Sequence, residues 1–175
     1  MRDNALAVAN YFIELAIKSD KTITQLGLMK RVYIAHGFSL ALNHKSLLDS
    51  RFDRVEAWKY GPVIPSVYHS FKQFRANPIT EKTLIMEWDE SNNEFKFRTP
   101  ELEDSKSKAI VQMVWQRYDG ISDSEMVTLT HKTGTPWDLC YVEGQNRPIP
   151  DEVTEFYYRN IVEAVKAKTS ANEPR

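Results

Sequence analysis

The first eighteen residues carry a helical pattern of apolar side chains. From residue 3 to residue 18 the apolar positions follow an i, i+3, i+4 spacing, at Ala5, Val8, Ala9, Phe12, Leu15 and Ala16. This spacing gathers them on one face and predicts an amphipathic helix. Asp3 or Asn4 is a suitable N-cap for it. The acidic residues within the stretch argue against a signal peptide.

A second helix is predicted over residues 24–42, with Thr24 as its cap. After Val32 this helix is apolar on most of its sides rather than along one stripe. A helix that is apolar all round is buried all round, so we expect it at the centre of the domain. Residues 43–45 then form a turn.

Residues 46–60 are short, mixed and aromatic, which allows one or two short strands. Residues 58–66 contain two prolines and a glycine, from which we expect no regular structure there. Pro65 and Ser66 open a short helix that reaches about Phe74.

Alternation of apolar and polar positions predicts a β-hairpin near the middle of the chain. Leu84, Met86 and Trp88 alternate with polar residues, and so do Phe95 and Phe97. The polar stretch 89–94 between them is a suitable turn.

Helical patterns return in the second half. Helices are predicted over residues 103–118, over 122–132 behind a capping box that begins at Ser122, and over 151–168, with a helical turn at Pro136 and a stiff link at 148–150. The last helix is expected to turn five residues inward: Val153, Phe156, Tyr157, Ile161 and Ala164.

These elements predict a mainly α fold with a small antiparallel β-hairpin or sheet, an α+β chain in which a helical bundle surrounds the central helix. The length of 175 residues suits one compact domain, placed at residues 1–168, followed by a flexible tail at 169–175. With 42% hydrophobic residues and only 14 glycines and prolines, bulk disorder is excluded.

Charge and cysteine content narrow the class of protein. No apolar run approaches the roughly 20 residues that cross a bilayer, and the single cysteine, Cys140, excludes an internal disulfide. We therefore expect a cytoplasmic protein. The net charge is −1, with +5 on residues 1–80 and −6 on residues 81–175. Folding either interleaves these charges or leaves a basic face for an acidic partner.

Common catalytic and metal-binding patterns are absent from the sequence. There is no glycine-rich phosphate loop, and the four histidines lack the paired spacing of a zinc site. We expect no metal and no cofactor. Nothing around Cys140 marks an activated thiol, although Cys140 with His131 is a nucleophile–base pair to consider.

The histidines and the acidic pairs each have a structural and a functional interpretation. His36 lies on an apolar face of the central helix, where it is a hydrogen-bonded core residue or a catalytic base. His131 ends a helix, where it interacts with the helix dipole or serves catalysis. The pairs Asp49/Asp53 and Asp119/Asp123 fall in turns and at a helix break, so we interpret them as solvated or capping residues.

The most unusual segment runs from residue 57 to residue 68, AWKYGPVIPSVY. Rigid aromatic side chains lose little entropy on binding and form interaction hot spots; alternatively, Trp58 and Tyr60 fill the core. We favour a mixture, with Trp58 inward and Lys59 and Tyr60 partly exposed. The candidate partner-binding residues are Arg51, Arg54, Trp58, Lys59, Tyr60, Gly61, Pro62, Pro65 and Tyr68, and no catalytic residue is proposed.

Three motifs in order resemble the phage-associated, SocA-like Panacea domain of antitoxins. They are Leu28-x-Lys30-x-x-Tyr33-x-Ala35-His36-Gly37-x-Ser39-Leu40, then Ala57-Trp58-x-Tyr60-Gly61-Pro62-Val63-x-Pro65-x-Val67-Tyr68, then Leu129-Thr130-His131-x-x-Gly134-x-Pro136-Trp137. The resemblance spans roughly residues 5–165. It implies a helical domain with a small sheet and an antitoxin role in bacterial or prophage toxin–antitoxin pairs.

The resemblance implies a non-enzymatic protein that binds and neutralises a cognate protein toxin. From the basic N-terminal half of the chain we expect Lys59, Arg51 and Arg54 to act as steering charges. It does not identify the toxin, and either a homo-oligomer or a hetero-complex with the toxin is compatible with it. Three alternatives stay open: an adaptor that delivers the toxin to a protease, an enzyme that uses His36 or His131, and a nucleic-acid binder. A sequence pI near 6.4 disfavours the last. Many relatives carry an additional DNA-binding domain, which we do not expect within these residues.

Overall fold

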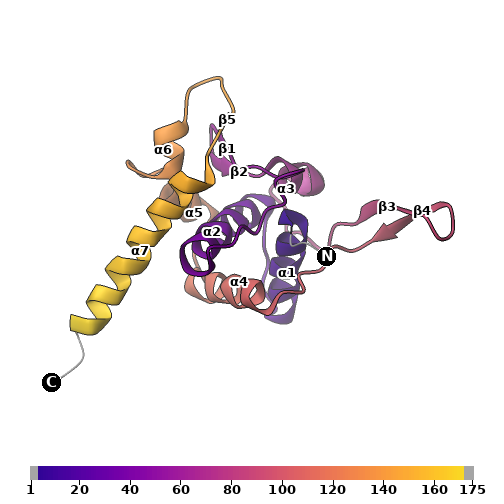
Figure 1. The fold of residues 1–175 in the computed structure, drawn as a ribbon, viewed down its shortest axis with the longest axis horizontal. Coiled ribbons are helices and arrows are strands. Elements are labelled where there is room, and N and C mark those ends of the chain that lie inside the picture. Colours follow the sequence, from indigo (N-terminus) through magenta and orange to yellow (C-terminus); the bar gives the residue numbers. More distant parts are fainter. Residues whose placement is uncertain (1–3, 172–175) are drawn as a thin grey trace.

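The computed structural model describes residues 4–171 of the chain (Figure 1). Its helices are α1 (Ala5–Lys18), α2 (Gln25–Asn43), α3 (Pro65–Phe71), η1 (Lys72–Phe74), α4 (Ser105–Arg117), α5 (Asp123–His131), α6 (Pro136–Cys140) and α7 (Asp151–Ala171). Its strands are β1 (Glu56–Trp58), β2 (Gly61–Val63), β3 (Ile85–Asp89), β4 (Glu94–Arg98) and β5 (Arg147–Pro148). The expected mainly α fold with small antiparallel sheets is confirmed.

The helix starts follow the capping signals in the sequence. The Asn4 side chain accepts a hydrogen bond from the Ala7 amide at 2.8 Å, and the Thr24 hydroxyl accepts one from the Gly27 amide at 3.2 Å. The capping box at Ser122 is also present. Asp3, the alternative cap for α1, lies outside the described residues.

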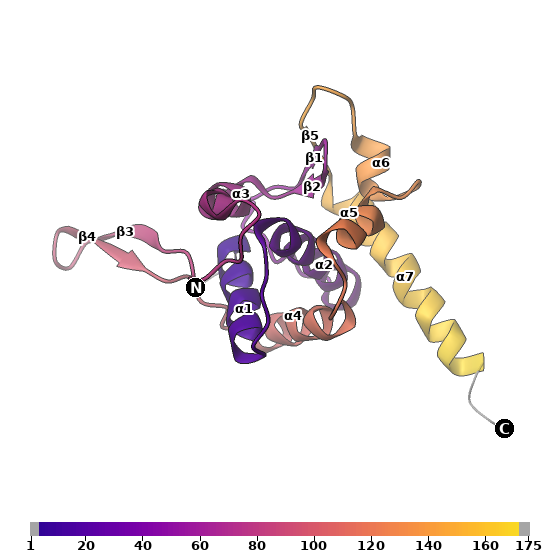
Figure 2. The same ribbon diagram turned by 180° about the vertical axis from the view of Figure 1, so that it is seen from behind.

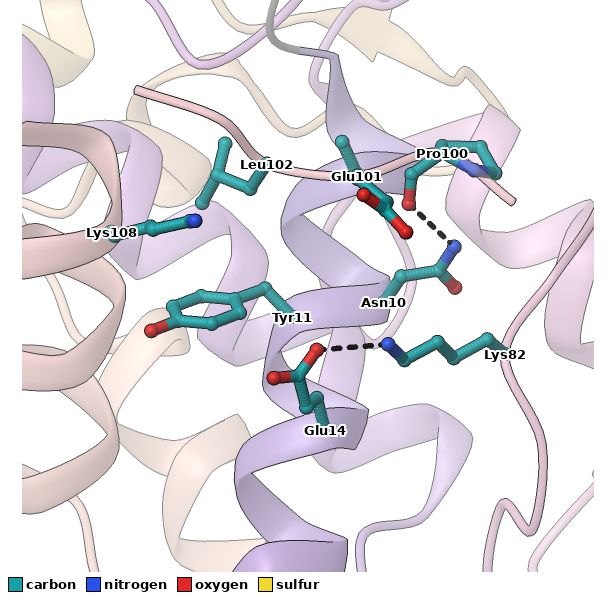
Figure 3. A pocket seen from close by; sticks show the side chains of 9 residues that line it. Asn10, Tyr11, Glu14, Lys82, Pro100, Glu101, Leu102 and Lys108 are labelled. Atoms are coloured by element: carbon teal, nitrogen blue, oxygen red, sulfur yellow. Dashed lines mark hydrogen bonds and ion pairs between the residues drawn. The ribbon is translucent and has the colours of Figure 1, made fainter. Parts of the chain in front are cut away.

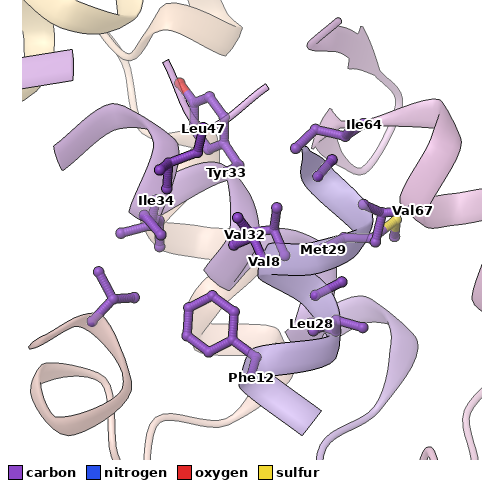
Figure 4. Close-up of a cluster of buried hydrophobic side chains, with 14 of the residues drawn as sticks. Val8, Phe12, Leu28, Met29, Val32, Tyr33, Ile34, Leu47, Ile64 and Val67 are labelled. Atoms are coloured by element: carbon purple, nitrogen blue, oxygen red, sulfur yellow. The ribbon is translucent and has the colours of Figure 1, made fainter. Parts of the chain in front are cut away.

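Helix α2 forms the centre of the domain, as its all-round apolar pattern predicts. Every residue from Gly27 to Leu40 is buried, and α1, α3, α4, α5 and α7 all contact this helix or one another around it. The close-up of the core shows Val8 and Phe12 of α1 beside Val32 of α2 (Figure 4). Burying these side chains supplies the main stabilising term of the fold.

A three-stranded antiparallel sheet, in the order β2-β1-β5, lies beside α2. The expectation that residues 58–66 have no regular structure is therefore wrong. β2 is an edge strand, so Pro62, which has no N–H to donate, can take part in it. The stretch 46–60 does contain a strand, β1.

The predicted central hairpin is present as β3 and β4, which pair only with each other. Figures 1 and 2 show this hairpin projecting from the helical body, on the side away from α7. Its large apolar side chains are exposed.

The buried face of α7 differs from the predicted one. Thr154 and Tyr158 are its buried residues, whereas Phe156 is 68% exposed and Ala164 is also exposed. The reason lies in α2: a Cβ at Gly37 would come within 2.2 Å of the Tyr158 ring, so that glycine makes room for Tyr158 rather than for Phe156.

Helix α7 continues to Ala171 and so includes the first three residues of the segment expected to be a tail. Residues 172–175 lie outside the described part of the chain. Within residues 4–171, no helix is both long enough and apolar enough to span a bilayer.

Candidate functional site

The unusual segment of residues 57–68 folds into a tight hairpin followed by a helix. Trp58 pairs with Gly61, so only Lys59 and Tyr60 form the loop between β1 and β2. Both loop residues are exposed, Tyr60 by 65%. Gly61 has a φ of +100°, which an L-residue rarely adopts and which allows the chain to turn there.

Side chains from two helices donate hydrogen bonds to carbonyl groups of this hairpin, and a third helix places a histidine ring beside it. Lys30 of α2 donates from Nζ to the Pro62 carbonyl at 3.0 Å. Trp137 of α6 donates from its indole to the Trp58 carbonyl at 2.7 Å. The ring of His131, at the end of α5, lies 3.2 Å from the Lys59 carbonyl. Because consecutive parts of the loop are fixed from different elements, its backbone is held in one conformation.

The aromatic side chains of the segment are oriented by local contacts. The Trp58 indole donates to the Glu56 carboxylate at 2.7 Å, and Glu56 also pairs with Arg54. The Trp58 ring lies 5.0 Å, centre to centre, from the Tyr68 ring on α3. The expected mixture, with Trp58 half-buried and Lys59 and Tyr60 exposed, is present.

A pocket of about 420 Å³ opens beside the loop. Its walls are mainly apolar and aromatic, with Leu26 and Met29 from α2, Trp58 and Tyr60 from the hairpin, and Tyr68 from α3. Concave apolar surface with rigid aromatic walls suits the anchoring side chain of a protein partner.

Lys30 is one of the residues that line this pocket, and it is completely buried. Burial disfavours its charged form and lowers the pKa of Lys30 to about 7. Within residues 4–171 it makes no ion pair; its partner is the Pro62 carbonyl. Lys30 therefore braces the hairpin from inside and presents no exposed charge to a ligand.

The nine residues predicted to bind a partner fall into three groups. Trp58, Lys59, Tyr60 and Tyr68 surround the pocket, whereas Gly61 and Pro62 are buried behind it. Arg51, Arg54 and Pro65 line a separate hollow of about 260 Å³, together with the exposed Phe52.

The steering charges differ in how free they are. Arg51 and Arg54 are exposed but pair with Asp49 and Glu56, respectively. Lys59 lies over the Tyr60 ring, 5.6 Å from its centre.

Sequence reasoning missed Leu26, Met29 and Phe52, because nothing in their spacing distinguishes a pocket wall from the core.

The candidate catalytic histidines have structural partners. His36 is fully buried, and its Nε2 lies 3.0 Å from Oδ1 of Asp151, a contact that joins α2 to α7 and lowers the pKa of Asp151. His131 Nδ1 lies 2.8 Å from the Val127 carbonyl within its own helix. Burial raises the pKa of the Cys140 thiol, the reverse of what activates a nucleophile.

The acidic pairs are structural as well, although Asp49 and Asp53 are buried rather than solvated. Asp53 accepts hydrogen bonds from the Ala5 amide, the Asp49 amide and the Ser66 hydroxyl, and so connects the start of α1 to α3. Asp119 is exposed and pairs with Lys21. Among the described residues, no group of three His, Cys, Asp or Glu side chains could hold a metal ion.

All three motifs lie within the residues that match a known family. The family model described as "Antitoxin SocA-like, Panacea domain" matches residues 28–138. The chain is 31% identical over 140 residues to "Antitoxin SocA" of Caulobacter vibrioides (strain NA1000 / CB15N), covering 78% of this chain and 69% of that protein. No solved structure matches significantly. The match of the family model over most of the chain shows that it belongs to the antitoxin SocA-like Panacea domain family.

Proposed function

We propose that this chain is an antitoxin that neutralises a cognate protein toxin by binding it directly, through the surface formed by the β1–β2 loop and the pocket beside it. The observation that carries the proposal is the bracing of an exposed loop by hydrogen bonds from Lys30 and Trp137. A loop fixed before binding loses little conformational entropy when it binds, and this favours affinity.

The loop offers a central anchor of the kind that dominates protein interfaces. Tyr60 is exposed and projects from a fixed turn, and its neighbours Trp58 and Tyr68 are half-buried against the pocket. Interfaces of standard size bury about 800 Å² on each partner, so the toxin would also contact neighbouring surface, including the hollow beside Arg51.

A binding mechanism without catalysis is supported by the residues that were candidates for chemistry. His36 is sealed between α2 and α7, and the His131 ring contacts backbone carbonyls on both sides. The toxin would therefore be silenced by having its active surface covered. Delivery to a protease is distinguished from covering by the half-life of the toxin in cells with and without this chain.

The experiment is a neutralisation and binding assay with the product of a neighbouring gene that is toxic when expressed alone. Tyr60→Ala is expected to raise the dissociation constant by about 10-fold or more, as truncation of an aromatic hot spot does. The matched control is Phe156→Ala, because Phe156 is equally exposed but lies on α7. Equal affinities of the Tyr60→Ala variant and the wild-type chain would refute the proposed surface.

A further inference from the structure

The β3–β4 hairpin has one apolar face and one charged face. Its register pairs Met86 with Phe97 and Trp88 with Phe95, and paired residues of an antiparallel sheet point to the same side. Leu84 lies two residues before Met86, the spacing at which side chains of an extended chain point to the same side. We call this hairpin the arm. These five side chains form its apolar face, and each of them is between 49% and 74% exposed.

The charged side chains on the other face of the arm pair with one another. Arg98 makes two hydrogen bonds to the Glu87 carboxylate, at 2.6 and 2.7 Å, and Lys96 pairs with Asp89. These ion pairs use up the charges that could otherwise select an oppositely charged partner along the strands. The apolar face, by contrast, has nothing packed on it within the described residues.

The base of the arm is fixed to the body, so its projection is a built feature of the fold. Buried Asn10 of α1 donates to the carbonyls of Thr83 and Pro100, at 3.1 and 3.0 Å, and accepts from the Thr83 amide at 2.9 Å. Lys82 also pairs with Glu14 of α1 at 2.8 Å (Figure 3). Both legs of the hairpin are thereby held, while its strands project from the helical body (Figures 1 and 2).

An isolated two-stranded hairpin with an exposed apolar face is marginally stable in water, and exposed apolar patches of several hundred Å² mark interaction sites. We propose that the apolar face of the arm binds the same face of a second copy of this chain, forming a symmetric dimer.

The area of the face agrees with a dimer. Taking the roughly 150–250 Å² of an aromatic side chain for all five residues, their exposed parts add up to at most about 600 Å² per copy. Two copies face to face would bury at most about 1,200 Å² in total, which is the lower end for specific interfaces. We therefore expect a dimer that dissociates in the micromolar range.

The charges of the arm do not select an orientation of the two copies, because Lys82, Lys96 and Arg98 already pair with carboxylates of their own chain. Antiparallel arms keep the two helical bodies at opposite ends of the dimer. The antiparallel dimer also stacks the Trp88 rung of one copy on the Met86 rung of the other.

The test is sedimentation velocity of the full chain over about 5–200 µM, a range that brackets micromolar dissociation. The double variant Met86→Thr/Phe97→Thr removes one rung of the apolar face and keeps residues that favour strands. The control, Glu87→Thr/Lys96→Thr, alters the adjacent rung on the opposite face. Circular dichroism melting of each variant verifies that the helical body is folded.

We expect the wild-type chain and the control to form dimers, and the dimer of the Met86→Thr/Phe97→Thr variant to weaken by at least about 10-fold. A wild-type chain that stays monomeric at about 200 µM overturns the proposal, and so does equal weakening by both variants. A monomeric chain whose neutralisation of the toxin is lost in the Met86→Thr/Phe97→Thr variant also overturns it, because the toxin is then the occupant of the arm.

Discussion

Replacing Gly61 by alanine tests whether the shape of the β1–β2 loop depends on close packing beneath it. Gly61 has a φ of +100°, and a Cβ added there would lie 2.6 Å from Lys30 Nζ and 3.0 Å from His131 Cε1. Gly144 provides a matched control, since it also has a positive φ, +74°, but a Cβ there meets nothing within 4 Å. The two substitutions share backbone strain and differ in crowding.

The expected magnitudes follow from these two effects. A non-glycine residue at positive φ lowers the free energy of unfolding by about 1–2 kcal/mol, and this loss applies to both variants. Only Gly61→Ala also pushes Lys30 away from the Pro62 carbonyl, which leaves buried polar groups unpaired at a cost of about 1–3 kcal/mol. The Gly61→Ala variant should therefore be less stable than the Gly144→Ala variant by about 1–3 kcal/mol.

Urea unfolding followed by circular dichroism measures both free energies of unfolding, and thermal melting provides a second estimate. A chain of this size loses about 2–4 °C in Tm per kcal/mol, so Gly61→Ala should melt about 3–10 °C below Gly144→Ala. If the two variants lose equal stability, Lys30 moves aside without cost and does not brace the loop. The argument for a preformed binding surface would then fail as well.

Three further substitutions test single contacts. The pKa of Lys30 is about 7 in the folded chain and about 10.4 in the unfolded chain, so between these pH values the unfolded chain binds one proton more than the folded chain. The free energy of unfolding should therefore rise from pH 7 to pH 9, by up to about 1 kcal/mol per pH unit. Lys30→Met should abolish this rise, as measured by urea titrations at each pH. Asp53→Ala should cost about 3 kcal/mol in the same assay, because three donors lose their acceptor. Trp137→Phe frees the Trp58 carbonyl and should lower stability by about 1 kcal/mol and weaken toxin binding in calorimetry.

The elements that sequence patterns predicted well are those that local chemistry determines. The caps at Asn4, Thr24 and Ser122 depend on a side chain and an amide within three residues. The β3–β4 hairpin depends on alternation across a short turn. Each of these signals depends on a few neighbouring residues only, so it can be recognised from the sequence alone.

The features that the sequence did not predict depend on contacts between distant residues. Hydrophobicity favoured Phe156 as the inward residue of α7, but the space left by Gly37 on α2 accommodates Tyr158. Alternation showed that one face of the β3–β4 hairpin is apolar; whether that face is covered depends on the rest of the fold.

The candidate site was predicted only in part for a related reason. Residues 57–68 were recognisable as a stiff aromatic segment, but the braces of the loop are side chains that bind backbone carbonyls. A carbonyl has the same chemistry in every residue, so the sequence gives no sign that Lys30 and Trp137 meet at one hairpin. Lys30 is also a residue type that is rarely buried without an acidic partner.

The two proposed surfaces lie on different elements, and this constrains the assembly that they can form together. The loop of Lys59 and Tyr60 joins β1 to β2, whereas the arm is β3–β4, and α3 and η1 intervene along the chain. Occupying the arm with a second copy therefore leaves both loops available, and a dimer would bind two toxins. Light scattering of the purified complex distinguishes this 2:2 assembly from a 1:1 complex, in which the toxin covers the arm. In the 1:1 complex, substitutions in the loop and substitutions in the arm would both impair neutralisation. In the 2:2 assembly, only the loop substitutions would act on toxin binding directly.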